Sequence, residues 1–144
     1  MIRLFLILSI AHAQSYPDQK LTPGVIATTD QAKICRDGYT KDARHVTPAT
    51  KRQVFARYGF AKGKFKPGDY EIDHFVSLEL GGANDVQNLW PQPYSGKWTA
   101  REKDVVETTL HREICAGKIT LEEAQRRIRT DWIAEYKRIK GMKR

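Results

Sequence analysis

Cysteines and long apolar runs are scarce in this sequence. Its 144 residues include only two cysteines, too few for a zinc module held by four of them. Neither cysteine belongs to a CxxC pair, which argues against a dithiol redox catalyst. No apolar run approaches the roughly 20 residues that a membrane-spanning helix needs, and the mean hydropathy is -0.58. These absences exclude a polytopic membrane protein, and the length favours a single domain.

Acidic residues are outnumbered by basic ones. The chain has 17 Asp and Glu against 25 Lys and Arg, a formal net charge of +8. Such an excess favours a polyanionic partner, DNA or RNA above all, although it also fits a solvated helix face that serves only solubility. The residues that we expect to contact nucleic acid are Lys62, Lys64, Lys66, Arg101, Lys103, Arg126 and Arg127.

The first 13 residues have the pattern of a secretory signal peptide. Arg3 precedes an apolar run over residues 4–10, and Ala11-His12-Ala13 offers the small-x-small pattern that signal peptidase accepts. We therefore expect a secreted or periplasmic protein, cleaved after Ala13, that does not stay inserted in a membrane. The alternatives are an N-terminal anchor and a buried first helix.

Export would change how the two cysteines behave. In an oxidising compartment an even pair of cysteines predicts one disulfide, here between Cys35 and Cys115. The alternative is a pair of buried free thiols.

The first half of the chain predicts an extended segment followed by a helix. Residues 14–33 are polar and contain Pro17 and Pro23, so we expect an extended lead to a single domain over residues 34–144. Residues 34–39 fit a short strand or a loop. Thr47-Pro48 marks a helix start, because threonine caps a helix and proline suits its first position.

Two strands and two helices are predicted in the second half. Residues 70–80 alternate between two faces, as a strand requires, and residues 86–90 follow a glycine-rich turn as a second short strand. Residues 99–115 have helical spacing, and a capping box at Thr120 opens a basic last helix. The fold class expected is α+β.

The pair Asp73-His74, with Asn88 fourteen positions after the histidine, suits hydrolysis of a phosphodiester. A carboxylate gives a divalent cation a hard oxygen ligand, and an imidazole can take a proton from water near neutral pH. The amide of Asn88 could hold the imidazole by a hydrogen bond. Neighbours in a flat strand point to opposite faces, so joint action needs a bent strand or a carboxylate that reaches round its edge.

Three segments of the chain resemble the HNH, or ββα-metal, endonucleases. They are residues 70–74 (YEIDH), 78–85 (LELGGAND) and 88–91 (NLWP). More narrowly, the chain resembles small exported bacterial HNH-type proteins whose helix carries a Lys-Asp…Glu…Leu-His string, here within residues 103–111. The resemblance covers about residues 34 to 136. It implies a ββα-metal core, extended here by N- and C-terminal helices, and a metal-dependent endonuclease.

The resemblance also implies residue roles. His74 would be the general base, Asp73 a ligand of a divalent cation, usually Mg²⁺ with Mn²⁺ or Zn²⁺ as alternatives, and Asn88 the residue that orients the histidine and shapes the loop. The family's third element, a His or Asn near the helix start, is missing from residues 98–101. Glu107 and His111 lie four residues apart on one helix face and could supply helix ligands instead.

These residues could instead have purely structural roles. Glu107 could only pair with Lys103, and His111 could be a structural histidine beside the apolar stripe of its helix. Because the helix start departs from the family pattern, the chain could also be a catalytically impaired HNH-fold protein that binds nucleic acid or another polyanion. A third possibility is an exported structural domain. If the enzyme is active, we expect little sequence specificity, because no segment is left for a base-reading module.

Overall fold

The computed structural model of the chain describes residues 15–60 and 68–143. The predicted signal peptide and the three lysines Lys62, Lys64 and Lys66 lie outside the described residues. The described part is α+β, as predicted, and none of its helices is long and apolar enough to cross a membrane. Its elements are the helices α1 (Gln31–Ile34), α2 (Tyr39–Ala43), α3 (Pro48–Arg57), α4 (Ala100–Cys115) and α5 (Leu121–Ile139), the 3₁₀-helices η1 (Leu78–Leu80) and η2 (Val86–Asn88), and the strands β1 (Tyr70–His74) and β2 (Leu89–Pro93).

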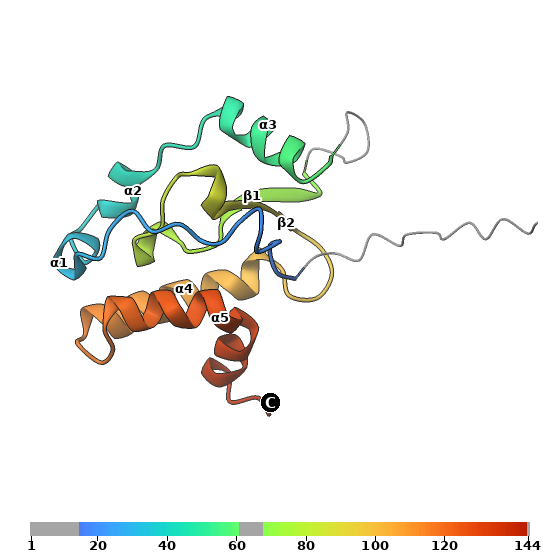
Figure 1. Cartoon of the computed structure of the whole chain (residues 1–144). Helices are drawn as coiled ribbons and strands as arrows, with labels where there is room; N and C mark the ends of the chain where they lie inside the picture. Colours follow the sequence, from blue (N-terminus) through green and yellow to red (C-terminus); the bar gives the residue numbers. More distant parts are fainter. Residues whose placement is uncertain (1–14, 61–67, 144) are drawn as a thin grey trace, which may run out of the picture.

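The strands form one antiparallel hairpin between two helical layers. Tyr70 pairs with Pro93 and His74 pairs with Leu89. Helix α3 lies on one side of the hairpin, and the antiparallel pair α4 and α5 lies on the other (Figure 1). Strands β1 and β2 and helix α4 follow one another along the chain, in the order that the sequence predicts.

The strand prediction for residues 70–80 is right only for its first half. Strand β1 ends at His74, and Leu78–Leu80 form a 3₁₀-helix. Phe75 and Val76 are both fully buried, although a strand would place them on opposite faces. The chain therefore turns after His74, and the apolar residues that follow enter the core as a loop. The second strand begins at Leu89, three residues later than expected, because residues 86–88 form a turn of 3₁₀-helix.

Capping residues set the helix starts that the sequence predicts. The Thr47 hydroxyl accepts a hydrogen bond from the Thr50 amide at 3.1 Å, with Pro48 in the first position of α3. The Thr120 hydroxyl caps α5 in the same way. The prediction of a strand or loop over residues 34–39 misses two short helices, α1 and α2, which flank this segment.

Helices α4 and α5 supply most of the core. The predicted stripe of α4, Val106, Leu110 and Ile114, is fully buried. It packs with the apolar face of α5 and with residues of the hairpin and η1 in one cluster. Helix α5 bends at Asp131, whose φ of -164° and ψ of 85° are not helical, and Figure 1 shows its last turns leaving the line of the first part.

The lead before α1 is extended but firmly packed. The hydroxyl of Thr22 is buried and donates to the carbonyl of Leu89 at 3.0 Å. The indole of Trp132 donates to the carbonyl of Ser15 at 3.0 Å. The lead is therefore part of the domain, although its polar composition predicts only an extended segment.

The predicted disulfide is confirmed. Cys35 and Cys115 are bonded, and their Cα atoms lie 5.7 Å apart. Cys35 caps the C-terminus of α1, and Cys115 is the last residue of α4. The bond therefore ties the N-terminal part of the domain to the layer formed by α4 and α5.

Candidate functional site

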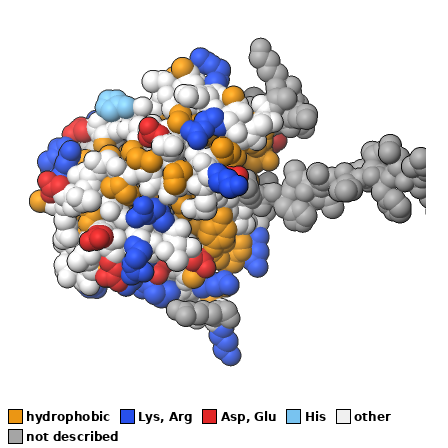
Figure 2. All heavy atoms as spheres, viewed as in Figure 1, with side chains coloured by type: hydrophobic (Ala, Val, Ile, Leu, Met, Phe, Trp, Pro, Cys, Tyr) orange, Lys and Arg blue, Asp and Glu red, His pale blue; other side chains and the backbone are white. Residues whose placement is uncertain are grey.

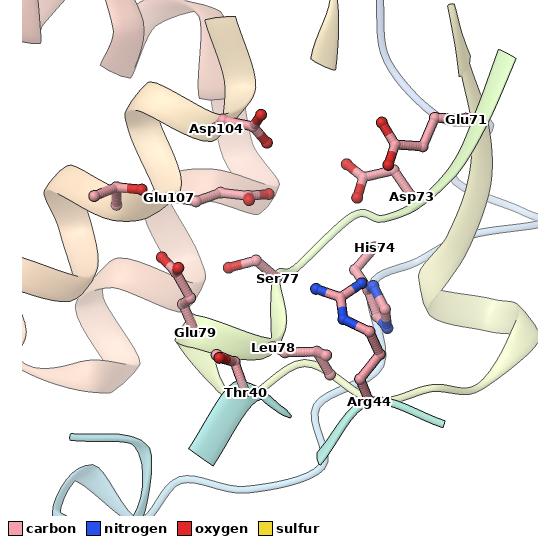
Figure 3. A pocket seen from close by; sticks show the side chains of 11 residues that line it. Thr40, Arg44, Glu71, Asp73, His74, Ser77, Leu78, Glu79, Asp104 and Glu107 are labelled. Carbon is pink, nitrogen blue, oxygen red and sulfur yellow. The ribbon is translucent and has the colours of Figure 1, made fainter. Parts of the chain in front are cut away.

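Asp73 and His74 line one pocket, together with residues of helix α4. The pocket has a volume of about 330 Å³ and lies between the end of β1, the start of η1, the α2–α3 connection and α4 (Figure 3). The side chains that line it are Thr40, Arg44, Glu71, Asp73, His74, Ser77, Leu78, Glu79, Asp104, Glu107 and Thr108. This convergence is what the hydrolytic interpretation of the sequence requires.

Asp73 and His74 can both line the pocket because they lie at the end of strand β1. His74 is the last residue of β1, and the Phe75 amide donates to the carbonyl of Asn88 at 2.7 Å as the chain turns toward η1. The imidazole is almost fully buried, whereas the Asp73 side chain keeps 19% of its surface exposed. The carboxylate thus reaches the pocket from its rim, while the imidazole lies deeper. The opposite orientation of neighbouring side chains in a flat strand therefore does not keep Asp73 and His74 apart.

Asn84 fixes the histidine ring. Its Oδ1 lies 3.0 Å from His74 Nε2, and its Nδ2 donates to the carbonyl of Ala43 at 2.7 Å. Because Nδ2 must donate to that carbonyl, Oδ1 faces the imidazole, and Nε2 is the nitrogen that carries the proton. Nδ1 is then left as the basic nitrogen. Burial lowers the pKa of His74 below its ordinary value, and the hydrogen bond that the ring donates to Asn84 offsets part of this effect.

The prediction that Asn88 holds the imidazole is wrong, because Asn84 does so. The Asn88 side chain is fully buried; its Oδ1 accepts from the Val76 amide at 2.9 Å, and its Nδ2 donates to the carbonyls of Val76 and Ala83 at 2.9 and 2.8 Å. Asn88 therefore shapes the loop, which is the other half of its predicted role. Gly82 completes this loop, since a Cβ there would lie 1.8 Å from the Val76 carbonyl oxygen.

Lys103 does not face a nucleic acid, contrary to prediction. Its side chain is 0% exposed, and its ammonium group donates to Asp73 Oδ2 at 2.9 Å, to the carbonyl of His74 at 2.6 Å and to Glu107 Oε1. Burial alone would lower the pKa of Lys103, but Asp73 and Glu107 raise it above its ordinary value, so the group stays charged. Lys103 therefore ties helix α4 to the end of β1.

Glu107 both lines the pocket and pairs with Lys103. Burial raises its pKa above the ordinary value for a glutamate, and the nearby ammonium group offsets part of that rise. The sequence offered pairing with Lys103 and a place in the site as alternatives, and the structure combines them.

Three further carboxylates, which were not predicted from the sequence, line the pocket: Glu71, Glu79 and Asp104. Burial raises the pKa of Glu71 and of Asp104, with a further rise from the charge of Asp73. Figure 3 shows the carboxylates of Glu71, Asp73 and Asp104 facing the same space. Spacing could have indicated two of them, because Glu71 lies two residues before Asp73 on the strand and Asp104 three before Glu107 on the helix.

His111 lies at the disulfide instead of in this pocket. Its Nε2 is 3.1 Å from the carbonyl oxygen of Ile34 and 3.6 Å from the Sγ of Cys115. The prediction that His111 joins Asp73 as a ligand of the same cation is therefore wrong. It shares a helix face with Glu107, but it lies one turn farther along α4, toward the disulfide.

The other described basic residues predicted to bind nucleic acid do not line the pocket. Arg101 is exposed near the start of α4, and Arg126 and Arg127 lie on α5, where Arg127 pairs with Glu123. On the face shown in Figure 2, Lys and Arg side chains are scattered among acidic ones. Arg44 is the basic side chain that lines the pocket itself, and Figure 3 shows its guanidinium beside the His74 ring.

The donor set of the pocket fits a hard divalent cation such as Mg²⁺ or Mn²⁺. Besides the carboxylates, Ser77 Oγ and Glu79 Oε2 are buried without a hydrogen-bond partner, and both residues line the pocket. Among the described residues, however, only Cys35, His111 and Cys115 place three His, Cys, Asp or Glu ligand atoms within 4.8 Å of one another. A cation in the acidic pocket would therefore take only one or two protein carboxylates, a ligand set that Mg²⁺ accepts in proteins when water or phosphate completes it.

Comparison of the chain with models of known protein families, with curated proteins and with solved structures finds no match.

Proposed function

We propose that the protein is a secreted or periplasmic, metal-dependent endonuclease that hydrolyses phosphodiester bonds with little sequence specificity. The observation that carries this proposal is the shared pocket of Asp73 and His74, closed on its far side by carboxylates of α4. In this interpretation β1, β2 and α4 are the ββα-metal core that the sequence resembles. The disulfide supports a location in an oxidising compartment.

The charge of the pocket explains why a cation is needed. Five carboxylates line it against one arginine and one histidine, so a phosphodiester would be repelled from the protein alone. Asp73, with Asp104 and Glu71 near it, would hold the cation at the rim. When bound, Mg²⁺ or Mn²⁺ would neutralise charge that builds on the phosphate and stabilise the leaving oxygen.

His74 is suited to activate the attacking water. Its lowered pKa keeps the ring neutral near pH 7, so Nδ1 can accept a proton from water. The proton on Nε2 stays hydrogen-bonded to Asn84 Oδ1, and this bond holds the ring in one orientation and stabilises the imidazolium that forms. Lys103 holds the Asp73 carboxylate in place through an ion pair of 2.9 Å.

Replacement of His74 should abolish cleavage while the fold survives. With Mg²⁺ or Mn²⁺, the purified protein should degrade plasmid DNA or a single-stranded RNA, and His74→Ala should be slower by roughly 10²–10⁴-fold, the usual contribution of a general base. His45→Ala is the matched control, because His45 is an exposed histidine that does not line the pocket. The melting temperature of both variants should stay within a few degrees of that of the parent. Equal cleavage by the parent and His74→Ala would refute the catalytic role.

A second candidate function is binding without cleavage. It is favoured by Lys103, whose ammonium group already occupies one oxygen of Asp73 and one of Glu107. This alternative predicts that the parent and His74→Ala retain labelled DNA or RNA equally at low salt and that neither cleaves it with any divalent cation.

A further inference from the structure

A second cluster of ligand atoms lies about the disulfide, away from the acidic pocket. Cys35, His111 and Cys115 bring two sulfur atoms and one imidazole nitrogen within 4.8 Å of one another. None of the three lines the acidic pocket. The proposed hydrolysis does not use them, and a disulfide alone does not need a histidine beside it.

Two of the ligands lie on one face of α4. His111 and Cys115 are four residues apart, which places their side chains one above the other along the helix. Cys35, at the end of α1, is held beside them by the disulfide. Cys115 is exposed, and Cys35 and His111 are half-buried, so a reductant and a metal ion can both reach the cluster.

One of the ligand distances already suits a tetrahedral zinc site. Bond lengths of about 2.3 Å for Zn–S and about 2.0 Å for Zn–N place a sulfur and a nitrogen ligand about 3.5 Å apart, and two sulfur ligands about 3.8 Å apart. The distance from His111 Nε2 to Cys115 Sγ is 3.6 Å. Once the disulfide is reduced, the two sulfur atoms must separate to reach this spacing, and rotation of the cysteine side chains can provide the movement.

We propose that the reduced protein binds a thiophilic cation of the Zn²⁺ class through Cys35, His111 and Cys115. Thiolate and imidazole are the ligands that zinc prefers, and three protein ligands leave a fourth position for water. The same three residues therefore hold the chain together in two ways, by a covalent bond when oxidised and by a metal ion when reduced.

Reduction of the disulfide precedes binding of the metal. A phosphine reductant gives two electrons to the disulfide and, with one water molecule, yields two thiols and the phosphine oxide. Binding of Zn²⁺ then releases the two thiol protons to solvent. His111 Nε2, which lies 3.1 Å from the carbonyl oxygen of Ile34 in the oxidised protein, coordinates the metal through its lone pair, with its proton on Nδ1 instead.

Cobalt provides a direct readout of this site. Titration of the phosphine-reduced protein with Co²⁺ should give one equivalent of thiolate-to-cobalt charge-transfer absorption in the near ultraviolet, which the carboxylates of the acidic pocket cannot produce. The oxidised protein and a Cys35→Ser/Cys115→Ser variant should give none. His111→Ala should weaken Co²⁺ and Zn²⁺ binding by at least roughly tenfold, since even outer-shell changes have effects of that size. His45→Ala, the matched control, should bind like the parent.

Thermal stability gives a second measurement, because reduction itself weakens the fold. Saturating Zn²⁺ should raise the melting temperature of the reduced parent by several degrees and that of reduced His111→Ala by much less. Unchanged affinity in His111→Ala would overturn the proposal, because the thiols alone would then bind the metal. A reduced chain that Zn²⁺ neither binds nor stabilises would also overturn it.

Discussion

Loss of the Cys35–Cys115 disulfide should lower the free energy of unfolding by about 4–5 kcal/mol. The bond joins residues 80 positions apart, so its removal frees a long loop in the unfolded chain. It also ties α1 to the end of α4, and in the described structure the Gln31 side chain supports this junction with one hydrogen bond, to the carbonyl of Ile114 at 3.1 Å. Urea denaturation of Cys35→Ser/Cys115→Ser at neutral pH measures the loss.

The parent protein under a phosphine reductant is the control for this experiment. It lacks the bond but carries no new hydroxyl groups, so it should lose about the same stability as the serine variant in the absence of metal. If either form unfolds within 1 kcal/mol of the oxidised parent, the disulfide is not the main constraint on the N-terminal part of the domain.

Lys103→Met should cost about 3–5 kcal/mol of folding free energy near pH 7. The substitution keeps the buried aliphatic part of the side chain but removes the ammonium group between Asp73 and Glu107. Both carboxylates then face each other with no cation, and the carbonyl of His74 loses a donor. Lys118→Met is the matched control, because Lys118 is exposed, and it should change stability by less than about 0.5 kcal/mol.

The stability loss of Lys103→Met should depend on pH, because the substitution changes the pKa of Glu107. Burial raises the pKa of Glu107 even in the parent, and loss of the ammonium group raises it further. A carboxyl whose pKa is higher in the folded state than in the unfolded state destabilises the fold as pH rises through the unfolded value. Because the pKa of Glu107 in the parent is about 8, the two folded proteins differ in bound protons only around and above that value, so the deficit of Lys103→Met relative to the parent should widen as pH rises from 7 toward 9. Addition of Glu107→Gln should remove this widening at pH 9, and a deficit that does not change between pH 7 and 9 would contradict this assignment.

The sequence predicted those parts of the fold that depend on local chemistry. Thr47 and Thr120 cap their helices because a threonine oxygen satisfies a free backbone amide whatever the rest of the chain does. The apolar stripe of α4 needs only the helical period. The strand after Tyr70 was predicted too long because alternation does not reveal where a chain turns, and Phe75 and Val76 show that both faces become buried there.

The candidate site was only partly predictable, because the path of the chain, which local patterns do not show, decides which side chains meet in it. Asn84 and Asn88 have the same side chain, and only the path of the loop decides which of them reaches His74 and which reaches Val76. Lysine is rarely buried, so the burial of Lys103 becomes expected only once β1 and α4 bring Asp73 and Glu107 together. The Asp73-His74 pair could be predicted because the carboxylate and the imidazole are adjacent in the sequence, so no knowledge of the fold is needed to bring them together.

Anomalous diffraction from a crystal soaked in Mn²⁺ tests the proposed hydrolysis most directly. The peak expected lies in the pocket between the end of β1 and α4, within coordination distance of an Asp73 oxygen and close enough to His74 Nδ1 for a water molecule to bridge them. Asp73→Asn should remove the peak and the cleavage of plasmid together. A protein that cleaves nucleic acid while manganese binds elsewhere, with Asp73→Asn fully active, would contradict the proposed site.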